Sequence, residues 1–222
     1  MVGQVGVAVG HEIRNPLTTV RGFLQMLGSE KNYEGAREYF SLMIEEIDKA
    51  DATISHLINL ANNKTNNPEN LNLNNIVHEC LSGYLDQERH SNIKIETRLN
   101  DIPDILIDKL EVRELIENLL INAIEAMPDG GTITVNTDTF DNEVLLIIQD
   151  QGTGISIEAA KCIGTPFFTT KETSAGLGLA ICYSIARRHS AQIQFVSTPK
   201  GTKFIVYFPG GSEREQKNGY GA

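Results

Sequence analysis

The sequence predicts an α+β protein in which an N-terminal helical hairpin, dimerising into a four-helix bundle, precedes an α/β sandwich. In residues 2–62 apolar side chains recur every three or four positions, as on one face of a helix. After residue 70 short alternating runs typical of strands dominate. A polar, asparagine-rich segment containing Pro68 separates the two patterns and is typical of a linker. The 222 residues, 41% of them apolar, suffice for two small domains.

The first helix is expected between Val2 and Leu27, with one buried stripe. The stripe consists of Val5, Val9, Ile13, Leu17, Val20, Leu24 and Leu27. Pro16 stands inside this helix and lacks the N–H group that would bond the carbonyl of Glu12. We therefore expect that the helix can bend beside Glu12.

The second helix is expected from Gly35 to Asn62, after the connection "GSEKNYEG". Its stripe follows a heptad in which only Asp51 is polar. The members are Phe40, Ile44, Ile47, Asp51, Ile54, Ile58 and Ala61. Because two helices alone cannot bury both stripes, we expect a homodimer through residues 2–62, paired as a four-helix bundle.

The chain is expected to divide into a hairpin at 1–62, a linker at 63–70, a second domain at 71–209 and a disordered tail at 210–222. The second domain should hold a sheet with helices on one face. The expected strands are "NIKIET", "TITVNT", "EVLLIIQD", "AQIQFVS" and "TKFIVYF", and helices are expected near 74–88, 108–127 and 177–189.

Composition limits the class of protein. The formal net charge of -10 argues against a general nucleic-acid binder, which needs clustered Lys and Arg. Cys80, Cys162 and Cys182 are widely spaced, which favours neither a disulfide framework nor a zinc site and fits a reducing cytoplasm. No apolar run has the roughly 18 residues that a bilayer requires.

The stretch "GHEIRNPL" places His11 two positions from both Val9 and Ile13. At about 100° per residue, the histidine points roughly 160° away from the apolar stripe, and we expect it to face solvent. A surface histidine without chemistry is the commoner interpretation, and no second His or Cys at helical spacing favours a metal. Glu12, however, can fix one imidazole nitrogen by a hydrogen bond and leave the other free to attack an electrophile.

Three later motifs have the composition of a nucleotide site. "ELIENLLINAIEAM" puts Asn118 and Asn122 on one helical face, where their amides either decorate the surface or provide oxygen ligands for Mg²⁺. "DQGTGI" places Asp150 at a strand end, where it can accept a hydrogen bond from an exocyclic amine, although a simple turn has the same pattern.

The third motif is "GLGL", which opens a helix whose free N–H groups favour phosphate. The small and polar stretch before it, Thr169 to Ala175, is expected to be a mobile cover with Lys171 as its positive charge. Neither a P-loop nor a Rossmann fingerprint is present in the sequence.

The motifs "HEIRNPL", "ENLLINAIEA", "DQGTG", "PFFTTK" and "GLGLAI" together resemble, in order, the H, N, G1, F and G2 boxes of two-component sensor histidine kinases. The resemblance covers residues 1–209, and in detail the sequence is similar to the cytoplasmic core of the Bacillus-type sporulation kinases. It implies a histidine kinase and Hsp90-like ATPase fold for the catalytic domain at 71–209. It also implies a cytoplasmic fragment of a protein that is anchored in the membrane only through an N-terminal sensor region absent here.

The resemblance also implies roles for individual residues. His11 matches the phosphoacceptor, with Glu12 as its acid/base partner, and Asn122 matches the Mg²⁺ ligand with Asn118 as its companion. Asp150 matches the adenine-recognising aspartate. The remaining ATP-binding positions are the glycines Gly152, Gly154, Gly176 and Gly178, the late threonine Thr202, and Phe168 and Lys171 of the lid.

The implied function is autophosphorylation of His11 from Mg²⁺-ATP. Transfer of the phosphoryl group to an aspartate of a response regulator docked near His11 follows, in a sporulation phosphorelay. A response-regulator phosphatase or binding scaffold is an alternative, in which Asn15, one turn after His11, orients a water. Chaperone and mismatch-repair ATPases are a third class, but they use a Glu where Asn118 stands and lack the hairpin.

Overall fold

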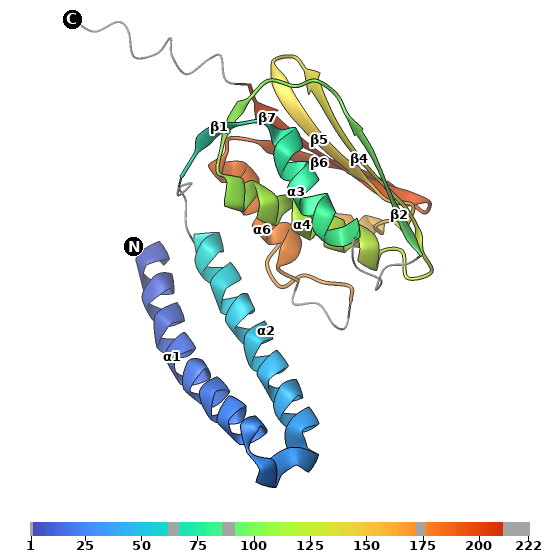
Figure 1. The fold of residues 1–222 in the computed structure, drawn as a ribbon. Helices are drawn as coiled ribbons and strands as arrows, with labels where there is room; N and C mark the ends of the chain where they lie inside the picture. Colours follow the sequence, from blue (N-terminus) through green and yellow to red (C-terminus); the bar gives the residue numbers. More distant parts are fainter. Residues whose placement is uncertain (1, 62–66, 86–91, 172–175, 211–222) are drawn as a thin grey trace, which may run out of the picture. The chain divides into compact units, whose positions relative to one another are not determined.

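A computed structural model of the chain (Figure 1) describes the backbone of residues 2–61, 67–85, 92–171 and 176–210. It describes the side chains of residues 13–30, 32–51, 53–54, 67–82, 92–171 and 176–210. The chain forms two compact units, Met1–Asn63 and Lys64–Ala222, and each is described by itself.

The first unit is a helical hairpin, as the sequence predicts. Helix α1 (Val2–Ser29) and helix α2 (Arg37–Ala61) are joined by the 3-10 helix η1 (Lys31–Ala36) and lie side by side (Figure 1). The helix α1 continues through Pro16, which stands inside it. The second helix begins two residues later than expected because η1 includes Gly35 and Ala36.

Among the described side chains, ion pairs connect the two helices of the hairpin. Arg14 Nε donates to Asp51 Oδ1 at 2.6 Å, and Arg21 Nε donates to Asp48 Oδ1 at 2.7 Å. Asp51 is the one polar residue in the predicted apolar stripe of α2. Its ion-pair partner, Arg14, belongs to the motif that contains His11. Exposed pairs of this kind contribute little stability, but they favour one register of the two helices.

The hairpin leaves large apolar side chains in contact with solvent. They are Ile13, Val20, Phe23, Met26, Tyr33, Tyr39, Leu42 and Met43. Ile13 and Val20 belong to the predicted stripe of α1 and are 44% and 49% exposed. One copy of the hairpin therefore does not bury its own apolar surface.

The second unit is built on a five-stranded sheet in the order β2-β4-β5-β7-β6. The strands are β2 (Ile93–Leu99), β4 (Gly131–Phe140), β5 (Glu143–Gln149), β6 (Gln192–Thr198) and β7 (Gly201–Pro209). Strands β2 and β4 are parallel and the other pairs are antiparallel. These are the five strands that the alternating runs predict.

Within the described part of the second unit, two shorter strands and one short helix escape the sequence pattern. Strand β1 (Glu69–Leu71) pairs antiparallel with β3 (Ile105–Ile107), and α5 (Ile157–Ala160) follows β5. β1 includes Glu69 and Asn70, the end of the predicted linker. Residues 62–66 of that segment and 211–222 of the expected tail lie outside the described residues.

Helices cover one face of the large sheet (Figure 1). They are α3 (Leu73–Leu85), α4 (Lys109–Glu125) and α6 (Gly178–Arg188), close to the predicted ranges. The core between helices and sheet contains Leu115 and Leu119 of α4 and Val135, Leu146 and Phe208 of the strands, each at most 1% exposed. The predicted α+β sandwich is confirmed.

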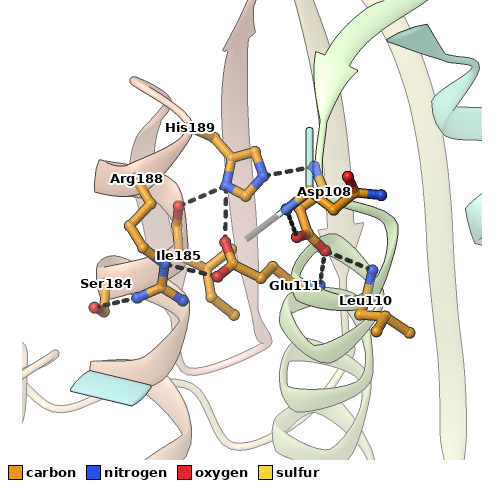
Figure 2. A network of polar contacts seen from close by, with 8 residues as sticks. Asp108, Leu110, Glu111, Ser184, Ile185, Arg188 and His189 are labelled. Atoms are coloured by element: carbon orange, nitrogen blue, oxygen red, sulfur yellow. Dashed lines mark hydrogen bonds and ion pairs between the residues drawn. The ribbon is translucent and has the colours of Figure 1, made fainter. Parts of the chain in front are cut away.

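A buried polar network holds the start of α4 against the end of α6 (Figure 2). The Asp108 carboxylate caps α4 by accepting from the N–H groups of Leu110 and Glu111 at 3.0 and 3.2 Å. The backbone N–H of Asp108 donates to His189 Nε2 at 3.0 Å. Since Nε2 accepts, Nδ1 carries the proton and donates to the Ile185 carbonyl at 2.9 Å, so the imidazole is neutral.

The same network contains a buried ion pair between Arg188 and Glu111. Arg188 Nε donates to Glu111 Oε1 at 2.9 Å, and the two side chains are 2% and 12% exposed. Arg188 Nη1 also donates to Ser184 Oγ at 2.9 Å. The pair therefore joins α4 to α6, the two helices that border the candidate site described below.

We expect Arg188→Met to lower the free energy of unfolding by about 3 kcal/mol, because it leaves the buried Glu111 carboxylate without its cation. Urea unfolding followed by far-ultraviolet circular dichroism measures the change. Arg113→Met is the matched control, since its pair with Glu117 on α4 is exposed and its loss should cost less than about 1 kcal/mol. Equal losses in the two variants would contradict the structural role of the buried pair.

Candidate active site

The second unit contains a cavity of about 510 Å³ between the end of α4, the loop after β5 and the start of α6. This is the size range of small-molecule sites. Eight of the residues predicted to bind ATP line it: Asn122, Asp150, Gly154, Phe168, Lys171, Gly176, Gly178 and Thr202. Segments up to 80 positions apart in the sequence thus meet at one cavity.

Asp150, at the end of β5, is 5% exposed and lines the cavity. Its Oδ1 accepts from the N–H groups of Gly152 and Thr202 at 2.8 and 3.0 Å. Among the described residues, no group donates a hydrogen bond to Asp150 Oδ2. One carboxylate oxygen is therefore fixed by the backbone, and the other is available as an acceptor for a ligand.

Two glycines shape the loop beside Asp150. Gly152 is buried against the end of α4, where a Cβ would lie 2.5 Å from the carbonyl oxygen of Ala126, and it is not part of the cavity lining. Gly154 has φ +72°, and a Cβ there would lie 2.0 Å from the carbonyl oxygen of Thr198. Any side chain at either position would push the loop away from its neighbours.

Asn118 and Asn122 share the face of α4 that is turned toward the start of α6. A Cβ on Gly178 would lie 2.9 Å from Asn118 Oδ1 and 3.9 Å from Asn122 Nδ2. Asn118 is not part of the cavity lining, and its Nδ2 donates to the Glu114 carbonyl at 2.8 Å. Asn122 lines the cavity, and its buried Nδ2 has no hydrogen-bond partner within the described residues.

The uncommitted amide of Asn122 fits a magnesium site. Its two ends are exchanged by a simple rotation, so the oxygen can face the cavity as a ligand. Mg²⁺ is usually held by one or two protein oxygens together with phosphates and waters, and it does not need a larger cluster of protein ligands.

The part of the cavity near the end of α4 also carries a positive charge and a helix start. Lys171 Nζ and Glu125 Oε2 form an ion pair at 2.5 Å, and both residues line the cavity. Helix α6 begins at Gly178 without a side-chain cap, so the N–H groups of its first turn are available to an anion. Residues 172–175 of the expected cover lie outside the described residues.

Sequence reasoning missed Ser197 on β6. Its Oγ accepts from the N–H of Ile155 at 2.8 Å and lies 2.9 Å from Thr202 Oγ1. Ile155 and Thr202 both line the cavity. Ser197 has no local motif, because the register between β6 and β7 and the loop after β5 create its contacts.

The predicted residues His11, Glu12 and Asn15 lie on α1, in the first unit. The side chains of His11 and Glu12 lie outside the described residues, while Asn15 is exposed. The predicted phosphoacceptor and the cavity therefore belong to different units.

The cysteine thiols do not form a further reactive site among the described residues. The three cysteines are free thiols, and burial raises the pKa of Cys80 to about 11 and raises the pKa of Cys182 as well. None of the helices in the described ranges is long and apolar enough to cross a membrane.

Two family models match the chain. Residues 8–66 match the His Kinase A (phospho-acceptor) domain. Residues 107–212 match the histidine kinase-, DNA gyrase B-, and HSP90-like ATPase domain. The first range includes His11 and the second includes the motifs that line the cavity.

Curated relatives include several sporulation kinases of Bacillus subtilis (strain 168). Sporulation kinase A is 36% identical over 212 residues, which are 94% of this chain and 35% of that protein. Sporulation kinase B is 29% identical over 215 residues, which are 94% of this chain and 50% of that protein. The similarity therefore does not single out kinase B, and the chain spans half or less of either relative.

Solved structures share the fold. ShkA, solved at full length in complex with AMPPNP, has a TM-score of 0.83 at 21% identity, over 94% of this chain and 46% of that chain. The histidine kinase ThkA, solved in complex with the response regulator protein TrrA, has a TM-score of 0.64 at 25% identity, over 94% of this chain and 61% of that chain. With its phospho-acceptor domain followed by an HSP90-like ATPase domain, the chain belongs to the histidine kinases.

Proposed function

We propose that this chain is the core of an ATP-dependent protein-histidine kinase that phosphorylates its own His11 and passes the phosphoryl group to an aspartate of a response regulator. The observation that carries the proposal is the cavity around Asp150, where the motifs of the second unit meet. The match of residues 8–66 to a phospho-acceptor domain supports His11 as the acceptor.

In this proposal the cavity binds ATP with its base at Asp150. The free Oδ2 accepts from the exocyclic amine of adenine, and Thr202 lies beside it. The first turn of α6 and Lys171 bind the phosphates. Asn122 holds Mg²⁺, which neutralises phosphate charge. Asn118 lies beside Asn122 on the same face of α4.

The reaction is an in-line displacement at the γ-phosphorus. One imidazole nitrogen of His11 forms the new N–P bond, the bond to the bridging oxygen breaks, and ADP leaves. Glu12 holds the second imidazole nitrogen and accepts its proton as the ring becomes positively charged. Catalysis consists mainly of positioning and charge neutralisation, so the two units must come together for the reaction.

We further propose a homodimer through residues 2–62 and a response regulator docked near His11. The exposed apolar residues of the hairpin, including Ile13 and Val20, support a second copy as their cover. The sporulation kinases among the relatives support a place in a sporulation phosphorelay, in the cytoplasm.

Incubation of the chain with ATP carrying a labelled γ-phosphate tests the kinase proposal. We expect label on the protein that is lost in acid and survives alkali, as a phosphoramidate bond requires, and no label from ATP marked at the α-phosphate. A chain that binds ATP and acquires no γ-label would contradict the kinase and favour a phosphatase or scaffold.

Asn122→Ala should reduce Mg²⁺-dependent labelling at least about a hundredfold, because it removes the proposed protein ligand of the metal. Labelling over a magnesium titration, with the dimer checked by light scattering, measures the effect. Asn136→Ala is the matched control, since its half-buried amide lies on β4 and does not line the cavity. Normal labelling by Asn122→Ala would refute the metal assignment.

A further inference from the structure

We infer that Ser197 is a positioning residue that directs the Thr202 hydroxyl into the cavity as a hydrogen-bond donor and thereby selects adenine over oxo-purine bases. The inference rests on the proposed function, because it requires a nucleotide in this cavity. Asp150 alone recognises only the exocyclic amine of the base. The Thr202 hydroxyl, directed by Ser197, recognises a second position on the same edge.

The two hydroxyl groups face each other across the end of the sheet. Ser197 on β6 and Thr202 on β7 are cross-strand partners, and their oxygens lie 2.9 Å apart. Thr202 is 3% exposed and lines the cavity. Its backbone N–H donates to Asp150 Oδ1 at 3.0 Å. Thr202 therefore holds the Asp150 carboxylate with its backbone and offers its own hydroxyl group to the base.

Counting protons gives the direction of the bond between the hydroxyls. Ser197 Oγ already accepts the N–H of Ile155 at 2.8 Å. Among the described residues, Thr202 Oγ1 is the acceptor within reach of the Ser197 proton. When Ser197 donates to it, the proton of Thr202 has no protein acceptor and turns to the cavity. The opposite direction leaves the Ser197 proton without a protein partner instead. Thr202 lines the cavity, where a ligand or a water can accept its proton, and Ser197 does not line it, so the first arrangement is favoured.

The resulting pair of reading groups is an acceptor beside a donor. Asp150 Oδ2 accepts, and the Thr202 hydroxyl donates, directly or through one water. Adenine presents the complementary edge, with a donor at N6 and an acceptor at N1. Hypoxanthine and guanine present the reverse, an acceptor at O6 and a donor at N1. Both positions therefore discriminate against an oxo-purine.

Inosine triphosphate is the sharpest probe, because it differs from ATP only at this edge. Displacement of a fluorescent ATP analogue gives dissociation constants for both nucleotides in wild type, Ser197→Ala, Ser197→Thr and Thr198→Ala. Thr198 is the matched control, since its exposed hydroxyl at the same strand end accepts from the Lys200 N–H. Circular dichroism confirms that each variant is folded.

We expect Ser197→Ala to reduce the preference for ATP over inosine triphosphate about tenfold, chiefly by weakening ATP. Ser197→Thr should restore the preference, and Thr198→Ala should leave it unchanged.

Equal weakening of both nucleotides in Ser197→Ala would overturn the inference, because it would show that Ser197 only holds the loop at Ile155. An unchanged preference would overturn it as well. If wild type bound neither nucleotide, the proposed function would fail first and the inference with it. Binding of both nucleotides by wild type with equal affinity would overturn the inference alone.

Discussion

His11→Gln should reduce the acid-labile label from γ-labelled ATP to background, while the affinity for ATP stays within about twofold of wild type. The amide nitrogen of glutamine has no free lone pair, so it cannot form the N–P bond. The nucleotide affinity should remain because the cavity lies in the other unit. Labelling and displacement of a fluorescent ATP analogue measure the two quantities on the same preparation.

His78→Gln is the matched control for this experiment. His78 is an exposed histidine on α3, in the second unit, and does not line the cavity. We expect it to acquire label like wild type. Label of the same acid lability on His11→Gln would assign the phosphoacceptor to another residue, and label lost in both variants would point to a general effect of the substitution.

Much of the architecture is predictable from local patterns. The periodicities of α1 and α2 and the five alternating strands of the large sheet each extend over seven or more residues. Strands β1 and β3, with three residues each, are too short to show an alternation. They exist because they pair with each other, and pairing between distant segments is not encoded in either one.

The candidate site divides in the same way. Asp150, Gly154 and Asn122 stand in motifs whose order along the chain identifies them, and the structure brings them to one cavity. Ser197 stands in an ordinary strand, and its partner Ile155 is 42 positions away. Its contact follows from the placement of β6, which a single sequence does not specify.

The polar residues of the helices show the same limit. Asp51 is recognisable as an exception in an apolar stripe, but its partner Arg14 is 37 positions away on the other helix. Arg188 and Glu111 are 77 positions apart and give no periodic signal. Tertiary packing creates such pairs, so sequence patterns reveal the exception and not the partner.

Asp150→Asn should reverse the preference of the cavity for the base. Because Oδ1 accepts two backbone N–H groups, the asparagine keeps its oxygen in that position and turns its NH₂ group to the cavity. A donor then faces the N6 amine of adenine, and we expect the affinity for ATP to fall about a hundredfold. The O6 acceptor of inosine triphosphate suits the new donor, so its affinity should fall much less or rise.

Asp150→Ala separates this recognition from general damage to the loop. Alanine removes the acceptor of both buried N–H groups together with the acceptor for the adenine amine, so we expect it to weaken both nucleotides, ATP more than inosine triphosphate, and to lower the free energy of unfolding by about 2 kcal/mol. Asp150→Asn keeps those two bonds and should unfold close to wild type. Dissociation constants for both nucleotides, with urea unfolding of each variant, therefore distinguish an inverted hydrogen bond from a distorted site. If Asp150→Asn lowered the affinity for both nucleotides equally, the carboxylate would act through its charge or by holding the loop. It would then not act as the acceptor that reads the amine of adenine.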